Sequence, residues 1–95
     1  MSDKIDATAL VRVEEMTVYP NPTHELVNIR FISDEKSDYD LTMINTIGKT
    51  VKSQRVQYEQ GENFITVPTN DLPQGIYFIK MSNGKSSYTQ KLIIE

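Results

Sequence analysis

Apolar and polar residues alternate along two stretches of the chain, residues 26–32 and 39–43. A period of two residues places successive side chains on opposite faces, which is typical of a β-strand buried on one side only. Both stretches are therefore predicted to be half-buried strands. The side chains expected to face the core are Val27, Ile29, Phe31, Tyr39, Leu41 and Met43.

Five further stretches have the composition of strands and are separated by turn residues. They are Met16–Tyr19, Thr50–Tyr58, Asn63–Val67, Ile76–Ile79 and Lys85–Ile94. Residues 50–58 are the most polar and are expected at the edge of a sheet. Residues 76–79 are β-branched or aromatic without a break, which predicts a buried strand. About seven short strands, with turns about every 8–12 residues, predict an all-β fold, an antiparallel β-sandwich of the immunoglobulin-like type.

Proline and glycine mark several of the turns. Pro20–Thr23 contains two prolines around Asn21 and ends the first strand, because proline cannot donate to a sheet ladder. Gly48 suits a short hairpin, since glycine accepts positive φ. Pro73 and Gly75 suit the second and last positions of a β-turn.

The Asn-Gly pair at residues 83–84 is the strongest hairpin signal in the chain. A two-residue turn there would set Ile79 opposite Tyr88 and Tyr77 opposite Gln90. The last quarter of the chain is therefore predicted to be a turn, a core strand and its hairpin partner.

Length and composition narrow the possible functions. The 95 residues fit one domain, with residues 1–15 expected to be a leader or linker and residues 16–95 the sandwich. A net charge of −3 without a basic stripe argues against a nucleic-acid partner. The chain has no cysteine, so disulfides and thiolate metal sites are excluded. No apolar run approaches the roughly 20 residues of a transmembrane segment.

Candidate catalytic and metal-binding residues are few. His24 has no second histidine or cysteine to complete a metal site and is expected to be an exposed turn residue. Four carboxylates form an acidic turn that lacks the spacing of a calcium loop. They are Asp34, Glu35, Asp38 and Asp40. The chain contains no catalytic motif, so we expect neither an enzymatic activity nor a cofactor.

Aromatic and basic side chains offer two other possible surfaces. The five tyrosines are Tyr19, Tyr39, Tyr58, Tyr77 and Tyr88. They could line a carbohydrate-binding face, but the favoured interpretation places them in the core with their hydroxyls hydrogen-bonded at its rim. Lys80, Lys85 and Lys91 lie on the last hairpin, where lysine usually protects an exposed edge.

Five motifs follow one another in a fixed order. They are Val18–Thr23, Ile44–Val51, Gly61–Asn63, Leu72–Lys80 and Lys91–Ile94. In this order and spacing, residues 16–95 resemble the type A C-terminal sorting domain of the type IX (Por) secretion system of Bacteroidetes. The positions that match the motifs of that family are Pro20, Asn21, Pro22, Gly48, Lys49, Gly75, Tyr77, Lys91, Leu92, Ile93 and Ile94.

The resemblance implies a function in protein export. Such domains follow cargo proteins that enter the periplasm through a signal peptide. The type IX translocon recognises the folded domain and carries the cargo across the outer membrane, and a sortase-like peptidase usually removes the domain. The cargo is released or attached to surface lipopolysaccharide. Because the segment after Met1 lacks the apolar region of a signal peptide, we expect this chain to be a fragment of a larger exported protein.

The resemblance also implies where recognition and cleavage occur. The terminal strand, Lys91–Ile94, is the part that the machinery is thought to read, and the cleaved bond is expected within residues 1–16. Many members end in a basic residue, whereas this chain ends in Glu95. An exposed terminal strand could also pair with another chain.

Two other functions stay open on the residues alone. One is a small immunoglobulin- or fibronectin-like module that binds carbohydrate or protein at the cell surface. The other is a structural spacer in a repetitive adhesin. A fold of this kind supports many functions, so the choice depends on the surface rather than on the architecture.

Overall fold

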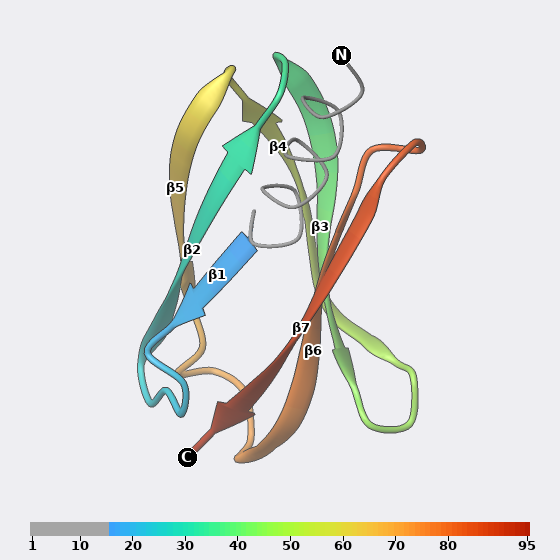
Figure 1. Ribbon diagram of the computed structural model, residues 1–95. Helices are drawn as coiled ribbons and strands as arrows, with labels where there is room; N and C mark the ends of the chain where they lie inside the picture. Colours follow the sequence, from blue (N-terminus) through green and yellow to red (C-terminus); the bar gives the residue numbers. More distant parts are fainter. Residues whose placement is uncertain (1–15) are drawn as a thin grey trace, which may run out of the picture.

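A computed structural model describes residues 16–95, and within this range it contains seven β-strands and no helix (Figure 1). The strands are β1 (Met16–Tyr19), β2 (Leu26–Ser33), β3 (Ser37–Asn45), β4 (Thr50–Tyr58), β5 (Gly61–Pro68), β6 (Gly75–Ser82) and β7 (Ser87–Ile94). They form two antiparallel sheets, β1-β2-β5 and β4-β3-β6-β7, that face each other. The predicted sandwich is confirmed, and the predicted leader lies outside the described residues.

The strand order is that of an immunoglobulin-like domain. The three-stranded sheet corresponds to strands A, B and E of that fold, and the four-stranded sheet to C′, C, F and G. Tyr77 near the start of β6 donates a hydrogen bond from its hydroxyl to the carbonyl of Pro73 at 2.7 Å. This contact reproduces the tyrosine corner of immunoglobulin domains. Two residues later, where antibody domains have a disulfide-bonded cysteine, β6 has Ile79, which is 1% exposed.

The core lies between the sheets and is lined by alternate residues of each strand. All six side chains predicted to face inward on β2 and β3 are buried, which confirms the period-two interpretation. Phe31 of β2 reaches three tyrosines of the opposite sheet. Its ring centroid lies 5.0 Å from that of Tyr58 and 5.1 Å from those of Tyr39 and Tyr88. This aromatic cluster joins the two layers at one end of the sandwich.

Tyrosines contribute to the core largely as expected. Tyr39, Tyr58 and Tyr77 are buried, whereas Tyr19 is 41% exposed. The hydroxyl of Tyr58, however, has no hydrogen-bond partner among the described residues. The prediction that the hydroxyls are bonded is therefore wrong for Tyr58.

β4 lies at the edge of its sheet, as its polar composition predicts. Its pairing with β3 shifts by one residue, because Met43 faces Lys52 while Ile44 faces Thr50. Val51 is the extra residue of this β-bulge. The bulge explains why Val51 packs against the core although its position in the alternation differs from that of Val56.

The predicted register of the last hairpin is wrong by two residues. β6 and β7 pair Tyr77 with Leu92 rather than with Gln90, and Ile79 with Gln90 rather than with Tyr88. Because the shift is an even number of residues, the same side chains still face the core.

The side chain of Asn83 explains the longer loop. Its Oδ1 accepts hydrogen bonds from the backbone N–H groups of Lys85 at 2.9 Å and Ser86 at 2.7 Å. The backbone N–H of Asn83 donates to the carbonyl of Ser86 at 3.1 Å. The loop therefore spans residues 83–86 rather than the Asn-Gly pair alone.

β6 is apolar on both faces, but only one face is buried. Tyr77 and Ile79 point into the core, whereas Ile76 is 41% and Phe78 36% exposed. The prediction of a buried strand therefore holds for the inner face only. A hydrogen-bonded turn also precedes the predicted one, with the Leu72 N–H donating to the Thr69 carbonyl at 3.1 Å.

The contacts of Phe31 predict a large stability effect from its loss. Phe31→Ala should lower the free energy of unfolding by about 3–5 kcal/mol, because it empties a fully buried site between the sheets. Phe64→Ala is the matched control, since Phe64 is 62% exposed and should cost less than about 1 kcal/mol. Urea unfolding followed by circular dichroism measures both. Equal losses would contradict the central place of Phe31 in the core.

Candidate functional site

The first and last motifs of the chain meet in the structure. The loop after β1 passes along the outer edge of β7, so that residues 21–23 lie beside residues 91–95. Figure 1 shows the C-terminus close to this loop. We call this contact the terminal junction, made of Asn21 and Thr23 on one side and Lys91–Glu95 on the other.

Asn21 pairs with β7 through its side chain. Its Nδ2 donates to the carbonyl of Lys91 at 2.8 Å, and its Oδ1 accepts from the N–H of Ile93 at 2.9 Å. The amide thus offers one donor and one acceptor, as a neighbouring strand does through its backbone. Both peptide bonds that lead into the prolines, Tyr19–Pro20 and Asn21–Pro22, are cis.

Thr23 continues the pairing with its backbone. Its N–H donates to the carbonyl of Ile93 at 2.8 Å, and its carbonyl accepts from the N–H of Glu95 at 2.8 Å. These two bonds form a parallel bridge between Thr23 and Ile94. The threonine is 3% exposed, and its hydroxyl donates to the carbonyl of Leu26. The bridge therefore ties the three-stranded sheet to the edge of the four-stranded sheet.

The fourth motif lies on the other side of β7. Gly75 pairs with Ile94, and Tyr77 pairs with Leu92, in the antiparallel β6–β7 ladder. The end of β7 is thus held between β6 and the terminal junction. The predicted motif positions form four groups along the chain, and the structure brings three of them together: Pro20–Pro22, Gly75 with Tyr77, and Lys91–Ile94.

Gly48 and Lys49 are not part of this assembly. They belong to the β3–β4 loop, and β4 lies at the opposite edge of the sheet from β7. Asn45 organises the loop, because its Oδ1 accepts from the backbone N–H of Lys49 at 2.9 Å. Gly48 has φ of 88°, as predicted for its hairpin position.

Side chains of the terminal strand divide between two environments. Leu92 is fully buried and Ile94 is 3% exposed, so both belong to the core. Lys91 is exposed and Ile93 is partly exposed on the outer face. Because the terminal junction occupies the outer edge of β7 over these residues, this stretch is not an open edge at which another chain could pair. The side chains of Lys91 and Ile93 remain accessible instead.

Two titratable groups have altered pKa values. Burial, with a smaller contribution from nearby Tyr39, raises the pKa of Tyr58 to about 12. The Lys52 ammonium lies 3.0 Å from the exposed Asp71 carboxylate, and this hydrogen bond lowers the pKa of Asp71. Neither group lies at the terminal junction. Both effects belong to the fold rather than to a reaction.

His24 and the acidic turn lie where the sequence places them, at the surface. His24 is exposed, and its Nδ1 lies 3.3 Å from the backbone carbonyl of Glu95. Within residues 16–95, no group of three or more histidine, cysteine or acidic side chains is placed to hold a metal ion. The same part of the chain contains no helix long and apolar enough to span a membrane.

Sequence reasoning missed two parts of this region. Thr23 was expected only to end a turn, and its pairing with Ile93, 70 residues away, leaves no local pattern. The exposure of Ile76 and Phe78 was also missed, because an unbroken apolar run does not distinguish one buried face from two.

The comparisons with known proteins agree with the motifs. Residues 17–95 match the family model described as "Secretion system C-terminal sorting domain". The chain belongs to this family, which is one of sorting signals rather than of catalysts. It therefore carries a C-terminal sorting signal for type IX secretion, the route of secreted and cell-surface proteins of Bacteroidetes.

Other comparisons add little. No curated protein matches the chain. Among solved structures, the chain is similar to part of a β-glucosidase from Listeria innocua, crystallised in complex with glucose, with 13% identity and a TM-score of 0.44. The match covers 84% of this chain and 16% of the enzyme. Both the identity and the TM-score are too low to support a conclusion about function.

The paired hydrogen bonds of Asn21 predict a measurable effect of a nearly isosteric change. Asn21→Asp should lower the free energy of unfolding by about 1–2 kcal/mol, because a carboxylate cannot donate to the Lys91 carbonyl and sets two acceptors against each other. Asn70→Asp provides the control, since Asn70 is exposed and lies in the β5–β6 loop rather than beside the outer edge of β7. Urea unfolding of both variants checks this. A loss shared equally by the two would point to charge alone.

The raised pKa of Tyr58 predicts a loss of stability at alkaline pH. The contribution of Tyr58 to stability is fully present below pH 10, where its side chain is neutral in both the folded and the unfolded chain. As pH rises from 10 to 12, only the unfolded chain releases the proton, so stability falls by up to about 2–3 kcal/mol. Tyr58→Phe should remove this part of the loss and leave stability at pH 7 equal or slightly higher, because the hydroxyl has no partner.

Tyr77→Phe serves as the matched control for this measurement. It removes a hydroxyl that donates to Pro73, so it should destabilise the protein at pH 7 by about 1 kcal/mol. Thermal unfolding of both variants between pH 7 and pH 12 checks the pair. An unchanged alkaline loss in Tyr58→Phe would show that other groups cause it.

Proposed function

We propose that this domain directs an attached cargo protein across the outer membrane through the type IX translocon, and that a sortase-like peptidase then removes it. The terminal junction is the single observation that carries this proposal. It joins the opening motif around Asn21 to the terminal strand Lys91–Ile94, so the two form one surface only when the chain is folded.

The signal in this proposal is a folded surface and not a linear peptide. The motif residues proposed to contribute are Pro20, Asn21, Pro22, Gly48, Lys49, Gly75, Tyr77, Lys91, Leu92, Ile93 and Ile94. Several of them have a structural task, such as the burial of Leu92 or the tyrosine corner of Tyr77. A misfolded domain would therefore lack the signal, which links export to completed folding of this domain.

Partners and localisation follow from the same proposal. The domain would act as a non-catalytic tail of a larger protein, with the cargo preceding it and the cleaved bond within residues 1–16. It would cross the periplasm before the cargo is released or retained at the cell surface. A carbohydrate-binding role is less well supported, because Tyr39, Tyr58 and Tyr77 are buried and cannot stack on a sugar.

An export assay tests the proposal. A signal peptide and a reporter protein are fused before residues 1–95 and expressed in a type IX-competent strain and in a translocon-deficient strain. We expect the reporter in the medium or on the surface of the competent strain only. Reporter held in the periplasm of both strains would overturn the proposed function.

Point substitutions separate loss of recognition from loss of folding better than truncation does. Removal of residues 91–95 also removes Leu92 and Ile94 from the core, so a block in export would not separate recognition from folding. Ile79→Asp serves as the unfolded control, since it places a charge at a site that is 1% exposed.

A further inference from the structure

Four apolar side chains lie together on the outer face of the four-stranded sheet. Phe78 of β6 is directly opposite Ile44 of β3, and Ile76 is directly opposite Ile93 of β7. Opposite residues on one face lie close enough for their side chains to touch. Ile76 and Phe78 are exposed to 41% and 36%, and Ile44 and Ile93 are partly exposed. We call these residues, Ile44, Ile76, Phe78 and Ile93, the outer patch.

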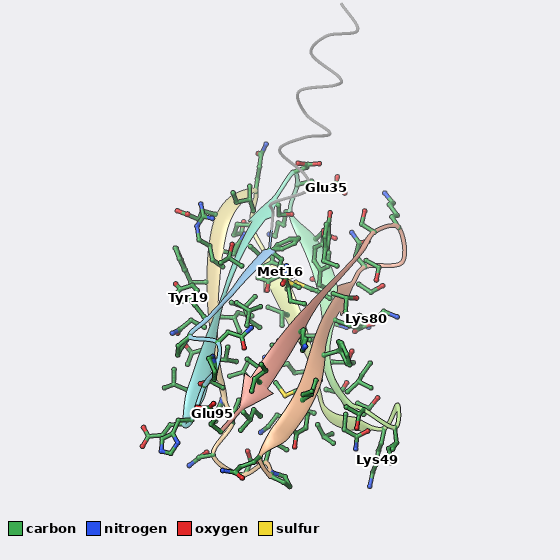
Figure 2. All side chains as sticks on the ribbon, turned by 60° about the horizontal axis from the view of Figure 1, so that its bottom comes forward. Met16, Tyr19, Glu35, Lys49, Lys80 and Glu95 are labelled. Carbon is green, nitrogen blue, oxygen red and sulfur yellow. The ribbon has the colours of Figure 1, made fainter. Side chains whose placement is uncertain are left out.

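Two lysines border the outer patch. Lys91 is directly opposite Phe78 in the β6–β7 ladder, and Lys80 follows two residues after Phe78 on the same face of β6. Figure 2 shows Lys80 on the opposite side of the molecule from Tyr19, which lies on the other sheet. Both lysines are exposed, and no carboxylate within residues 16–95 forms an ion pair with either.

The other cations of the described residues fall into two groups, since Arg30, Lys52 and Arg55 form ion pairs whereas Lys36, Lys49 and Lys85 form none within residues 16–95. Arg30 pairs with Glu62, and Arg55 pairs with Asp40 on the same outer face as the patch. The acid nearest the terminal strand in sequence is Glu95, whose side chain forms no ion pair within residues 16–95. Lys80 and Lys91 share the face of the outer patch, so exposed apolar side chains and lysines without an ion pair within residues 16–95 occur together there, on a chain whose net charge is −3.

The terminal junction limits how a partner can reach β7. Asn21 and Thr23 already use the backbone groups of Lys91, Ile93 and Glu95 at the outer edge. A partner that reads this end of the folded domain must therefore contact the face of the sheet. The outer patch is the part of that face where exposed apolar area and positive charge coincide.

We propose that the outer patch, with Lys80 and Lys91, is the docking surface for a protein of the export machinery. The partner surface would carry apolar side chains flanked by carboxylates. Charge complementarity selects this chemistry, since carboxylates would pair with the two free ammonium groups while the apolar residues pack on Phe78 and Ile76. This inference rests on the proposed function and names the face that the machinery reads.

Charge reversal in the export assay tests the docking surface. The double variant Lys80→Glu and Lys91→Glu should lower export of the reporter by about tenfold or more, because it opposes like charges at the interface. The matched control is Lys36→Glu with Lys85→Glu, which makes the same change in net charge in exposed loops away from the patch. Export of the control should stay within about twofold of wild type.

An aromatic pair tests the apolar part separately. Phe78→Ser should lower export by about tenfold, as expected for an interface anchor. Phe64→Ser is its control, because Phe64 is more exposed than Phe78 and lies on the other sheet. Thermal unfolding of each purified variant of residues 1–95 must stay close to wild type, so that a loss of export is not a loss of folding.

The outcomes separate this inference from the proposed function. If the wild-type fusion is not exported, the proposed function itself fails. If the wild type is exported and the Lys80 and Lys91 double variant is exported equally well, only the docking surface is wrong. Loss with the lysine variant but not with Phe78→Ser would indicate simple anion binding, such as to lipopolysaccharide, and would overturn the protein-docking proposal.

Discussion

The backbone pairing of Thr23 with Ile93 and Glu95 is the constraint on which the functional end of the molecule depends. Within residues 16–95, the other ladders run within one sheet or the other, whereas this bridge joins the loop of the three-stranded sheet to the edge of the four-stranded sheet. It fixes where the opening loop lies and satisfies backbone groups that an edge strand would otherwise expose. The position of Asn21 follows from it.

The terminal junction makes the two ends of the chain mutually dependent. β7 is held by β6 on one side and by Asn21 and Thr23 on the other, so the backbone groups at both edges of its C-terminal end are paired only when the first loop is in place. A protein that binds this surface therefore contacts residues that are about 70 positions apart in the sequence. A short unfolded peptide that contains Lys91–Ile94 would not have this arrangement of residues.

Sequence patterns predicted the layers of the fold better than its pairings. Alternation located Val27, Ile29 and Phe31 on the inner face, and polarity located β4 at an edge, because both depend on local burial. The β6–β7 register failed because the Asn83 side chain closes a longer loop than the Asn-Gly pair suggests. The hydrogen bonds of Asn21 could not be predicted from local sequence either, because its partners lie at the other end of the chain.

β6 shows how a folding signal and a recognition signal can share one strand. Its inner residues, Tyr77 and Ile79, are needed by the core, and their burial accounts for half of the apolar run. The core does not require the outer residues Ile76 and Phe78 to be apolar, since a strand with one solvated face normally alternates with polar side chains. Exposed apolar area is unfavourable in water, but it is favourable in a complex where a partner covers it. An apolar area bordered by lysine is therefore typical of an interaction site. The departure from alternation in β6, which misled the prediction of burial, is therefore the feature of the sequence that best indicates a binding face.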